Sequence, residues 1–121
     1  MKNIIITGGA GFIGSNLCRY LLDKGDNIFC VDNLSSGSFE NIKHLTTHKN
    51  FAFYEHDIED FFRIEDRIDE IYHLACPASP PIYQKDPIYT LKTNFIGTMN
   101  LLELARTKSA KILLASTSEI Y

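Results

Sequence analysis

The chain has 121 residues, which is enough for one domain with a hydrophobic core. Its hydrophobic content of 45% and charged content of 22% are those of an ordinary globular protein. The net charge of −3, without a long basic run, argues against a nucleic-acid partner or an anionic membrane surface. No apolar stretch approaches the roughly 20 residues that span a bilayer. The glycines after Thr7 come too early for a signal peptide.

The three cysteines, Cys18, Cys30 and Cys76, are an odd number without metal-ligand spacing. They predict reduced thiols and a cytoplasmic location. The four histidines are scattered along the chain, so the sequence indicates no metal site.

Short β-rich runs alternate with helical patterns along the whole chain, which predicts a parallel sheet flanked by helices. Strands are expected at 3–7, 27–32, 50–55, 70–74 and 111–115. Helical segments are expected at 11–24, 39–48 and 87–108. An acidic segment, 59–69, carries four apolar side chains to pack on the sheet: Phe61, Phe62, Ile64 and Ile68. Right-handed crossovers then give the strand order 3-2-1-4-5 of a Rossmann-type, doubly wound α/β fold.

A glycine pattern stands directly after the first strand and opens the first helix, with Gly8, Gly11 and Gly14 at equal spacing. In that context Gly8 allows a tight turn, and Gly11 leaves room for a pyrophosphate against the backbone. Gly14 permits close packing of the helix on the sheet. The unpaired N–H groups at the start of the helix would point at the phosphate. The alternative is a glycine-rich turn that binds nothing.

Asp32 ends the second strand, about 20 residues after the glycines, where a carboxylate can accept hydrogen bonds from the adenosine ribose. It would repel a 2′-phosphate, and the loop 33–38 contains no arginine to compensate. The sequence therefore favours NAD over NADP. The alternative is a solvated acid at the end of a strand.

Three further loops follow strand ends and are expected at the same edge of the sheet. Asp57 and Ile58 follow the third strand, the proline-rich segment 75–81 follows the fourth, and 116–121 follows the fifth. The hydroxyls and the carboxylate of the last segment offer hydrogen bonds to a substrate alcohol and a general acid or base, or else a helix cap.

Two further residues near the predicted crevice are expected to be structural. His73 is expected to be buried and hydrogen-bonded rather than catalytic. Cys76 is expected to line the crevice, because no cationic neighbour in the sequence activates its thiol.

These motifs resemble the extended short-chain dehydrogenase/reductases, the NAD-dependent nucleotide-sugar epimerases, dehydratases and decarboxylases. The residues that carry the resemblance are 7–14, 32–33, 57–58, 73–75 and 116–121. Within that family, the proline loop 72–81 together with 91–94, 97–98, 100 and 113–119 looks like the UDP-glucuronate decarboxylase branch almost residue for residue. The resemblance covers essentially the whole chain.

The resemblance also implies roles for individual residues. Those that would hold NAD are Gly8, Gly11, Phe12, Ile13, Gly14, Asp32, Asn33, Ser35 and Ser36. Those that would contact adenine or the nicotinamide half are Asp57, Ile58, Leu74, Ala75 and Lys92. Thr117 and Glu119 match catalytic residues of the family, whereas Cys76, Tyr83 and Asn100 are candidates for substrate contact. Cys76 stands where the decarboxylases usually have serine.

The catalytic base of that family is a tyrosine in a Tyr-x-x-x-Lys pair on the helix after the fifth strand, and no residue here matches that pair by position. Tyr121 matches the tyrosine that ends the Ser-Thr-x-Glu-x-Tyr motif. The resemblance therefore implies that residues 1–121 are the N-terminal part of an NAD-binding domain and are inactive by themselves. The alternatives are a sugar-nucleotide 4-epimerase or 4,6-dehydratase, and a nucleotide-binding module without catalysis.

The expected helix 87–108 carries two apolar rows, although one is enough to pack on a sheet. The row predicted to face the sheet is Ile88, Leu91, Phe95, Met99, Leu102 and Ala105. The row predicted to lie on the outside is Tyr89, Ile96, Leu101 and Leu104. In the resembled family this helix belongs to a four-helix homodimer interface, so a homodimer is expected here as well.

Overall fold

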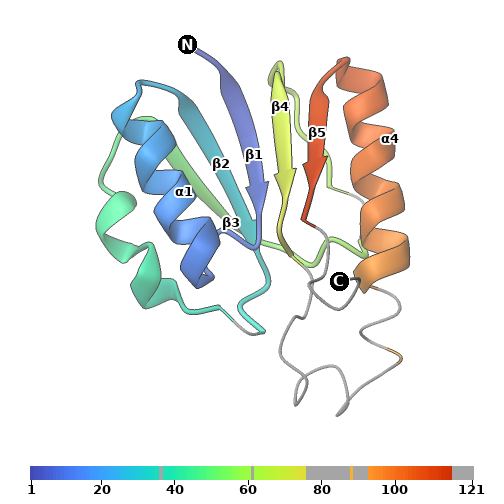
Figure 1. The fold of residues 1–121 in the computed structure, drawn as a ribbon, viewed down its shortest axis with the longest axis horizontal. Coiled ribbons are helices and arrows are strands. Elements are labelled where there is room, and N and C mark those ends of the chain that lie inside the picture. The colour runs from blue at the N-terminus through green and yellow to red at the C-terminus, as the bar shows by residue number, and fades with distance from the viewer. Residues whose placement is uncertain (36, 61, 76–87, 89–92, 116–121) are drawn as a thin grey trace.

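A computed structural model describes residues 1–35, 37–60, 62–75, 88 and 93–115 (Figure 1). Its strands are β1 (Asn3–Thr7), β2 (Asn27–Asp32), β3 (Phe51–Glu55), β4 (Glu70–His73) and β5 (Lys111–Leu114). All pair in parallel in the order β3-β2-β1-β4-β5. The predicted fold and strand order are therefore confirmed, with no strand end displaced by more than one residue.

β1 occupies the middle of the sheet because its side chains are apolar on both faces. Ile4, Ile5 and Ile6 are all completely buried, and their alternation sends Ile5 to the opposite face from the other two. One face packs on α1 (Phe12–Asp23), and the other packs on α4 (Thr98–Lys108). The helix residues that make these contacts are Cys18, Leu21 and Leu22 of α1 and Leu101, Leu104 and Ala105 of α4.

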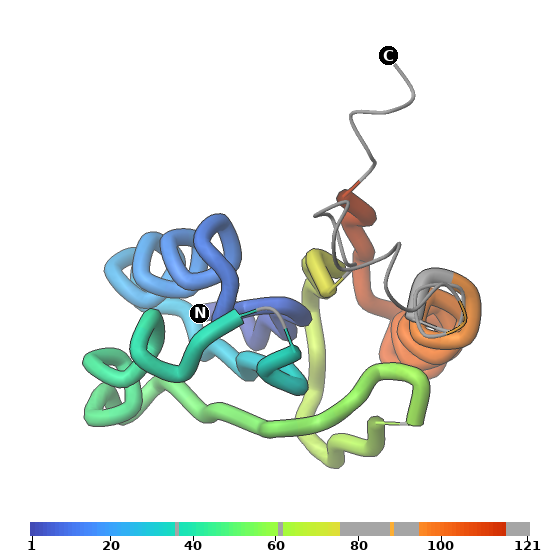
Figure 2. Tube along the Cα trace, turned by 90° about the horizontal axis from the view of Figure 1, so that it is seen from below, coloured from blue at the N-terminus to red at the C-terminus, as the bar shows by residue number. Residues whose placement is uncertain are grey.

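The connections on either side of β3 contain little regular helix. The segment predicted as one helix over 39–48 forms two short 3-10 helices, Phe39–Asn41 and Lys43–Leu45. The connection from β3 to β4, green in Figure 2, contains no helix among its described residues. It nevertheless buries Phe62 and Ile68 in the core on the α4 side, as predicted, while Phe61 lies outside the described residues.

The predicted long helix over 87–108 is described as a π-helical turn, Thr93–Gly97, followed by α4. Most of its described apolar side chains lie on the opposite face from the one predicted. Leu101 and Leu104 are only 2% and 3% exposed. The exposed side chains are Ile88, Phe95, Ile96, Met99 and Leu102. Ala105 is buried and Ile96 is exposed, both as predicted, whereas Tyr89 and Leu91 lie outside the described residues.

The rotation of α4 is set by close contacts with the connection between β3 and β4. A Cβ atom on Gly97 would lie 2.5 Å from Cδ1 of Ile58, so the helix backbone approaches that side chain directly. One turn later, Nδ2 of Asn100 donates a hydrogen bond of 2.8 Å to the carbonyl oxygen of Ile58. These contacts turn Leu101 and Leu104 inward. Apolar periodicity could not choose the face, because both rows are apolar.

Candidate functional site

The carboxyl ends of β1, β2 and β4 meet at one edge of the sheet, as the parallel arrangement requires (Figure 1). Thr7, the last residue of β1, pairs with Val31 of β2 and with His73 of β4. The segments that follow these strands therefore lie side by side. Six predicted site residues lie outside the described residues: Ser36, Cys76, Tyr83, Lys92, Thr117 and Glu119.

Gly8 makes the predicted tight turn after β1. Its φ is +71°, in the left-handed region that glycine enters without strain. Its N–H donates a hydrogen bond of 2.8 Å to the carbonyl oxygen of Val31. A Cβ atom at this position would lie 2.8 Å from the backbone carbon and oxygen of Leu74. The turn therefore touches the segment that follows β4.

Gly14 allows a closer approach than the expected packing of a helix on a sheet. A Cβ atom here would overlap the carbonyl oxygen of Gly8 and would lie 2.7 Å from Cα of Gly9. The start of α1 thus rests on the backbone of the glycine turn itself. Gly9, to which sequence reasoning gave no role, is also restricted, because a Cβ atom there would overlap the side-chain Sγ of Cys30.

The start of α1 has the features that an anionic ligand requires. Gly11 is the N-cap, so no side chain caps the helix, and the first turn contains no acidic residue. A Cβ atom on Gly11 would meet only the carbonyl oxygen of Gly8, at 3.4 Å, so the backbone is accessible there. Phe12 and Ile13 are 82% and 70% exposed. Uncapped N–H groups beside an accessible glycine fit a pyrophosphate.

Asp32 is almost fully buried, so the alternative of a solvated acid at a strand end is wrong. Its Oδ2 accepts a hydrogen bond of 2.9 Å from the N–H of Ala10, inside the glycine turn. Its Oδ1 accepts one of 2.8 Å from the N–H of Leu34. The carboxylate is thereby fixed beside the glycine turn, where a ribose hydroxyl could share it.

The loop after β2 closes onto the glycine turn through contacts that sequence reasoning missed. A Cβ atom on Gly37 would lie 2.8 Å from the carbonyl group of Ala10 and 3.1 Å from Oδ2 of Asp32. The same carbonyl oxygen accepts hydrogen bonds from the N–H of Ser38 (3.0 Å) and from Nδ2 of Asn41 (2.7 Å). The glycine at position 37 was the available signal.

Asn33 and Asp57 come together across neighbouring strand ends. Nδ2 of Asn33 donates a hydrogen bond of 3.2 Å to Oδ2 of Asp57, and Oδ1 of Asn33 accepts one of 3.0 Å from the N–H of Ser35. Three residues predicted to hold the cofactor are therefore neighbours in space.

Ile58 and Asn100 have structural contacts that limit the roles predicted for them. The side chain of Ile58 is buried against α4, and the adenine contact predicted for this residue stays a prediction. Nδ2 of Asn100 donates to the carbonyl oxygens of Ile58 (2.8 Å) and Glu59 (3.1 Å). Substrate contact by Asn100 stays a prediction, and both hydrogens of its amide nitrogen are already engaged.

His73 is buried and hydrogen-bonded, as predicted. It is 1% exposed, and its ring nitrogens lie 2.8 Å from Oγ1 of Thr7 and 3.1 Å from Oγ1 of Thr98. Burial disfavours the charged imidazolium and lowers the pKa of His73 to about 4. The ring is therefore neutral at physiological pH.

We expect His73 to make the protein less stable as the pH falls from about 6.5 to about 4. Its pKa is about 4 in the folded chain and near 6.5 when unfolded, so the unfolded chain takes up the proton first. The free energy of unfolding should lose about 3 kcal/mol over this range and recover it as the pH rises. Urea unfolding measured at several pH values should show that the free energy of unfolding falls more steeply with decreasing pH in the wild type than in His73→Gln. Equal slopes would contradict it.

The spacing Tyr-x-x-x-Lys occurs once in the sequence, at Tyr20 and Lys24. This pair lies at the C-terminal end of α1, whereas the glycine turn lies at its beginning. Nζ of Lys24 is 5.6 Å from the centre of the Tyr20 ring, which is 60% exposed. The pair is thus a surface cation–π contact, away from the candidate site.

Cys18 and Cys30 are free, buried thiols beneath the glycine turn. A hydrogen bond with Cys18, reinforced by burial, raises the pKa of the Cys30 thiol. A protonated, buried thiol is a poor nucleophile. These two residues therefore belong to the core.

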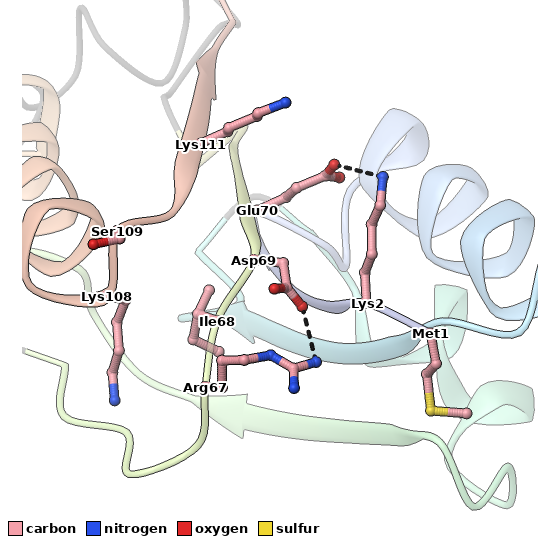
Figure 3. A pocket seen from close by; sticks show the side chains of 9 residues that line it. All are labelled: Met1, Lys2, Arg67, Ile68, Asp69, Glu70, Lys108, Ser109 and Lys111. Atoms are coloured by element: carbon pink, nitrogen blue, oxygen red, sulfur yellow. Dashed lines mark hydrogen bonds and ion pairs between the residues drawn. The ribbon is translucent and has the colours of Figure 1, made fainter.

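A cavity of about 380 Å³ lies at the amino ends of the strands, at the edge opposite the glycine turn (Figure 3). Two ion pairs line it, Lys2 with Glu70 at 2.9 Å and Arg67 with Asp69 at 3.2 Å. The side chains of Lys108 and Lys111 point in different directions around it (Figure 3). Because none of the predicted site residues lines this cavity, it is not the candidate site.

Among the described residues, no group of three histidine, cysteine or acidic side chains is placed to hold a metal ion. In the same part of the chain, no helix combines the length and the apolar character needed to cross a bilayer.

Residues 5–121 match the family described as GDP-mannose 4,6 dehydratase. The chain is 52% identical to a UDP-glucuronic acid decarboxylase 1 from Danio rerio over 120 residues, which are 99% of this chain and 28% of that protein. A UDP-glucuronic acid decarboxylase 4 from Arabidopsis thaliana is 48% identical over 118 residues, 98% of this chain and 26% of that protein. The chain thus spans little more than a quarter of the length of these relatives.

A solved structure supports the same family. A UDP-glucose 4-epimerase from Thermus thermophilus, in complex with NAD, is 34% identical with a TM-score of 0.74, covering 88% of this chain and 34% of that one. This similarity agrees with the resemblance found in the sequence. The chain belongs to the GDP-mannose 4,6 dehydratase family of nucleotide-sugar epimerases, dehydratases and decarboxylases.

Proposed function

We propose that residues 1–121 bind NAD and form the cofactor-binding part of an enzyme that modifies a nucleotide sugar. The observation that carries this proposal is the joint placement of an accessible Gly11, an uncapped start of α1 and the Asp32 carboxylate at one edge of the sheet. A pyrophosphate requires N–H donors without a competing acid, and a ribose requires an acceptor. The NAD complex of the Thermus thermophilus relative supports the choice of cofactor.

The preference for NAD over NADP follows from Asp32. A 2′-phosphate beside this carboxylate would be repelled at close range. The loop from residue 33 to residue 42 contains no lysine or arginine to offset that repulsion. Asn33 and Asp57, linked at 3.2 Å, are proposed to flank the adenosine half, and Leu74 and Ala75 to line the nicotinamide half.

For the whole enzyme we propose the conversion of UDP-glucuronate to UDP-xylose and CO2. Bound NAD would accept a hydride from C4 of the sugar as the C4 hydroxyl gives up its proton. The resulting β-keto acid would lose CO2 and take up a proton at the carbon that carried the carboxylate, and the hydride would then return to the ketone together with a proton. Thr117 is proposed to hydrogen-bond the sugar hydroxyl, and Glu119 to act as acid or base. About half of the aligned residues are identical in the decarboxylases of Danio rerio and Arabidopsis thaliana, which supports this substrate.

Two other functions fit the same scaffold. A 4-epimerase or a 4,6-dehydratase is supported by the family match and by the epimerase structures. A nucleotide-binding module without catalysis fits residues 1–121 considered alone, because none of them matches the Tyr-x-x-x-Lys base. We also propose a cytoplasmic homodimer for the whole enzyme.

The cofactor assignment is tested on the chain itself by calorimetry with NAD and with NADP. We expect weak binding of NAD and weaker binding of NADP. The Asp32→Asn variant should show a smaller difference in affinity between the two nucleotides. A preference of the wild type for NADP would contradict the role of Asp32.

The reaction is tested on the full-length enzyme with UDP-glucuronate. Release of CO2 with formation of UDP-xylose is the expected result. A 4-epimer or a 4-keto-6-deoxy sugar as the sole product would favour the alternatives. Turnover by purified residues 1–121 would contradict the proposal that these residues are inactive alone.

A further inference from the structure

Three side chains form a hydrogen-bond chain that has no direct part in the proposed NAD contacts. Oγ1 of Thr7, at the end of β1, lies 2.8 Å from Nδ1 of His73, at the end of β4. Nε2 of the same ring lies 3.1 Å from Oγ1 of Thr98, the first residue of α4. Thr7 and His73 are 0% and 1% exposed. These hydrogen bonds therefore connect the ends of β1 and β4 to the start of α4.

The direction of each hydrogen bond follows from counting donors and acceptors. Oγ1 of Thr7 accepts the N–H of Ala75 (3.2 Å) and that of Leu74 (3.0 Å), which Oγ1 shares with the carbonyl oxygen of Thr7 (3.1 Å). Because two N–H groups already point at this hydroxyl oxygen, we assign the hydroxyl hydrogen of Thr7 to Nδ1 of His73, at 2.8 Å. In the neutral ring the hydrogen then resides on Nε2, which donates to Thr98.

We propose that His73 is a positioning residue for the nicotinamide half of the cofactor, an inference that rests on the proposed NAD site. By accepting the Thr7 hydrogen, His73 leaves both lone pairs of Thr7 directed at the N–H groups of Leu74 and Ala75. These are the residues proposed to line the nicotinamide half. Their segment also lies against the glycine turn, since a Cβ atom on Gly8 would be 2.8 Å from the carbonyl group of Leu74.

Asparagine and glutamine at position 73 separate the two bonds of the ring. The side-chain oxygen of asparagine can take the place of Nδ1, whereas the amide of glutamine can take the place of Nε2. We expect His73→Gln, which loses the bond to Thr7, to bind NAD about fivefold to tenfold more weakly, the effect of one buried hydrogen bond. ADP lacks the nicotinamide ribose, so its affinity should stay within about twofold. His73→Asn should retain most of the NAD affinity.

The wild-type chain provides a test that does not depend on the folding of a variant. Nitrogen-detected NMR of the His73 ring should place the hydrogen on Nε2. A hydrogen on Nδ1 would overturn the proposed hydrogen bonds from Thr7 to His73 and from His73 to Thr98. His44→Gln, at an exposed histidine, is the matched control and should change neither nucleotide affinity.

The two nucleotides distinguish the possible failures. If His73→Gln loses NAD and ADP affinity equally, or loses neither, His73 does not position the nicotinamide half. If the wild type binds neither nucleotide, the proposed NAD site falls and the cofactor role of His73 falls with it. In that case the position of the ring hydrogen on His73 still shows whether the hydrogen bonds from Thr7 to His73 and from His73 to Thr98 form as proposed.

Discussion

Gly14→Ala is expected to destabilise the fold by about 3 kcal/mol and to abolish NAD binding. In an ordinary helix this substitution stabilises by up to about 1 kcal/mol. The sign reverses here because the added Cβ would overlap the carbonyl oxygen of Gly8 and lie 2.7 Å from Cα of Gly9. Both are backbone atoms, which cannot rotate away. The start of α1 would have to lift off the turn that presents its N–H groups.

Gly11→Ala is the matched control, three residues earlier. Gly11 has φ −80° and ψ 178°, an ordinary extended conformation, and a Cβ atom there would meet only the oxygen of Gly8 at 3.4 Å. This variant should be destabilised by less than about 1 kcal/mol, since alanine caps a helix less well than glycine. It should nevertheless lose NAD affinity, because the methyl group occupies the side proposed for the pyrophosphate.

Thermal unfolding and calorimetry on both variants decide between stability and binding. A Gly14→Ala variant with wild-type stability would show that the helix start can move away from the turn. A Gly11→Ala variant with wild-type NAD affinity would place the pyrophosphate elsewhere.

The sheet and the edge that carries the candidate site could be predicted because both depend on local sequence. The continuous apolar run Ile4–Ile5–Ile6 indicates a strand covered on both faces, and right-handed crossovers then leave little choice of strand order. In parallel strands every carboxyl end points to one edge. The proximity of Thr7, Asp32 and His73 could therefore be inferred.

The closing contacts of the site could not be predicted, because they join residues far apart in sequence. Asn41 reaches the carbonyl oxygen of Ala10 across 31 positions, and no local pattern marks that pair. The contact of Gly14 with Gly8 depends on where the turn places its backbone, which the spacing of the glycines does not reveal. The prediction of which face of α4 packs on the sheet was wrong for a similar reason. The backbone at Gly97 lies against Ile58, a residue of the connection between β3 and β4 that is distant in sequence.

The corrected faces of α4 lead to an expected result that contrasts two neighbouring leucines. Leu104 is 3% exposed and Leu102 is 41% exposed. Leu104→Glu would place a carboxylate in the core, at a cost of several kcal/mol, which is comparable with a typical domain stability of about 5–15 kcal/mol. We expect this variant to unfold. Leu102→Glu should melt at the same temperature as the wild type.

Leu102 also belongs to an exposed apolar row with Phe95 and Met99, which are 66% and 56% exposed. Covering each of these side chains would contribute roughly 1.5–3 kcal/mol. We therefore expect the wild-type chain to self-associate through this row, in line with the proposed homodimer, and Leu102→Glu to be monomeric.

Sedimentation velocity and circular dichroism on the two variants test the rotation of the helix and its association separately. A folded Leu104→Glu together with an unfolded Leu102→Glu would show that the sequence-based assignment of the faces was right after all. If the wild type stays monomeric at high concentration, the row does not bind a second copy, even if the helix rotation is correct. Association that persists unchanged in Leu102→Glu would move the interface to another surface, for which the exposed Leu113 and Leu114 of the edge strand β5 are the next apolar candidates.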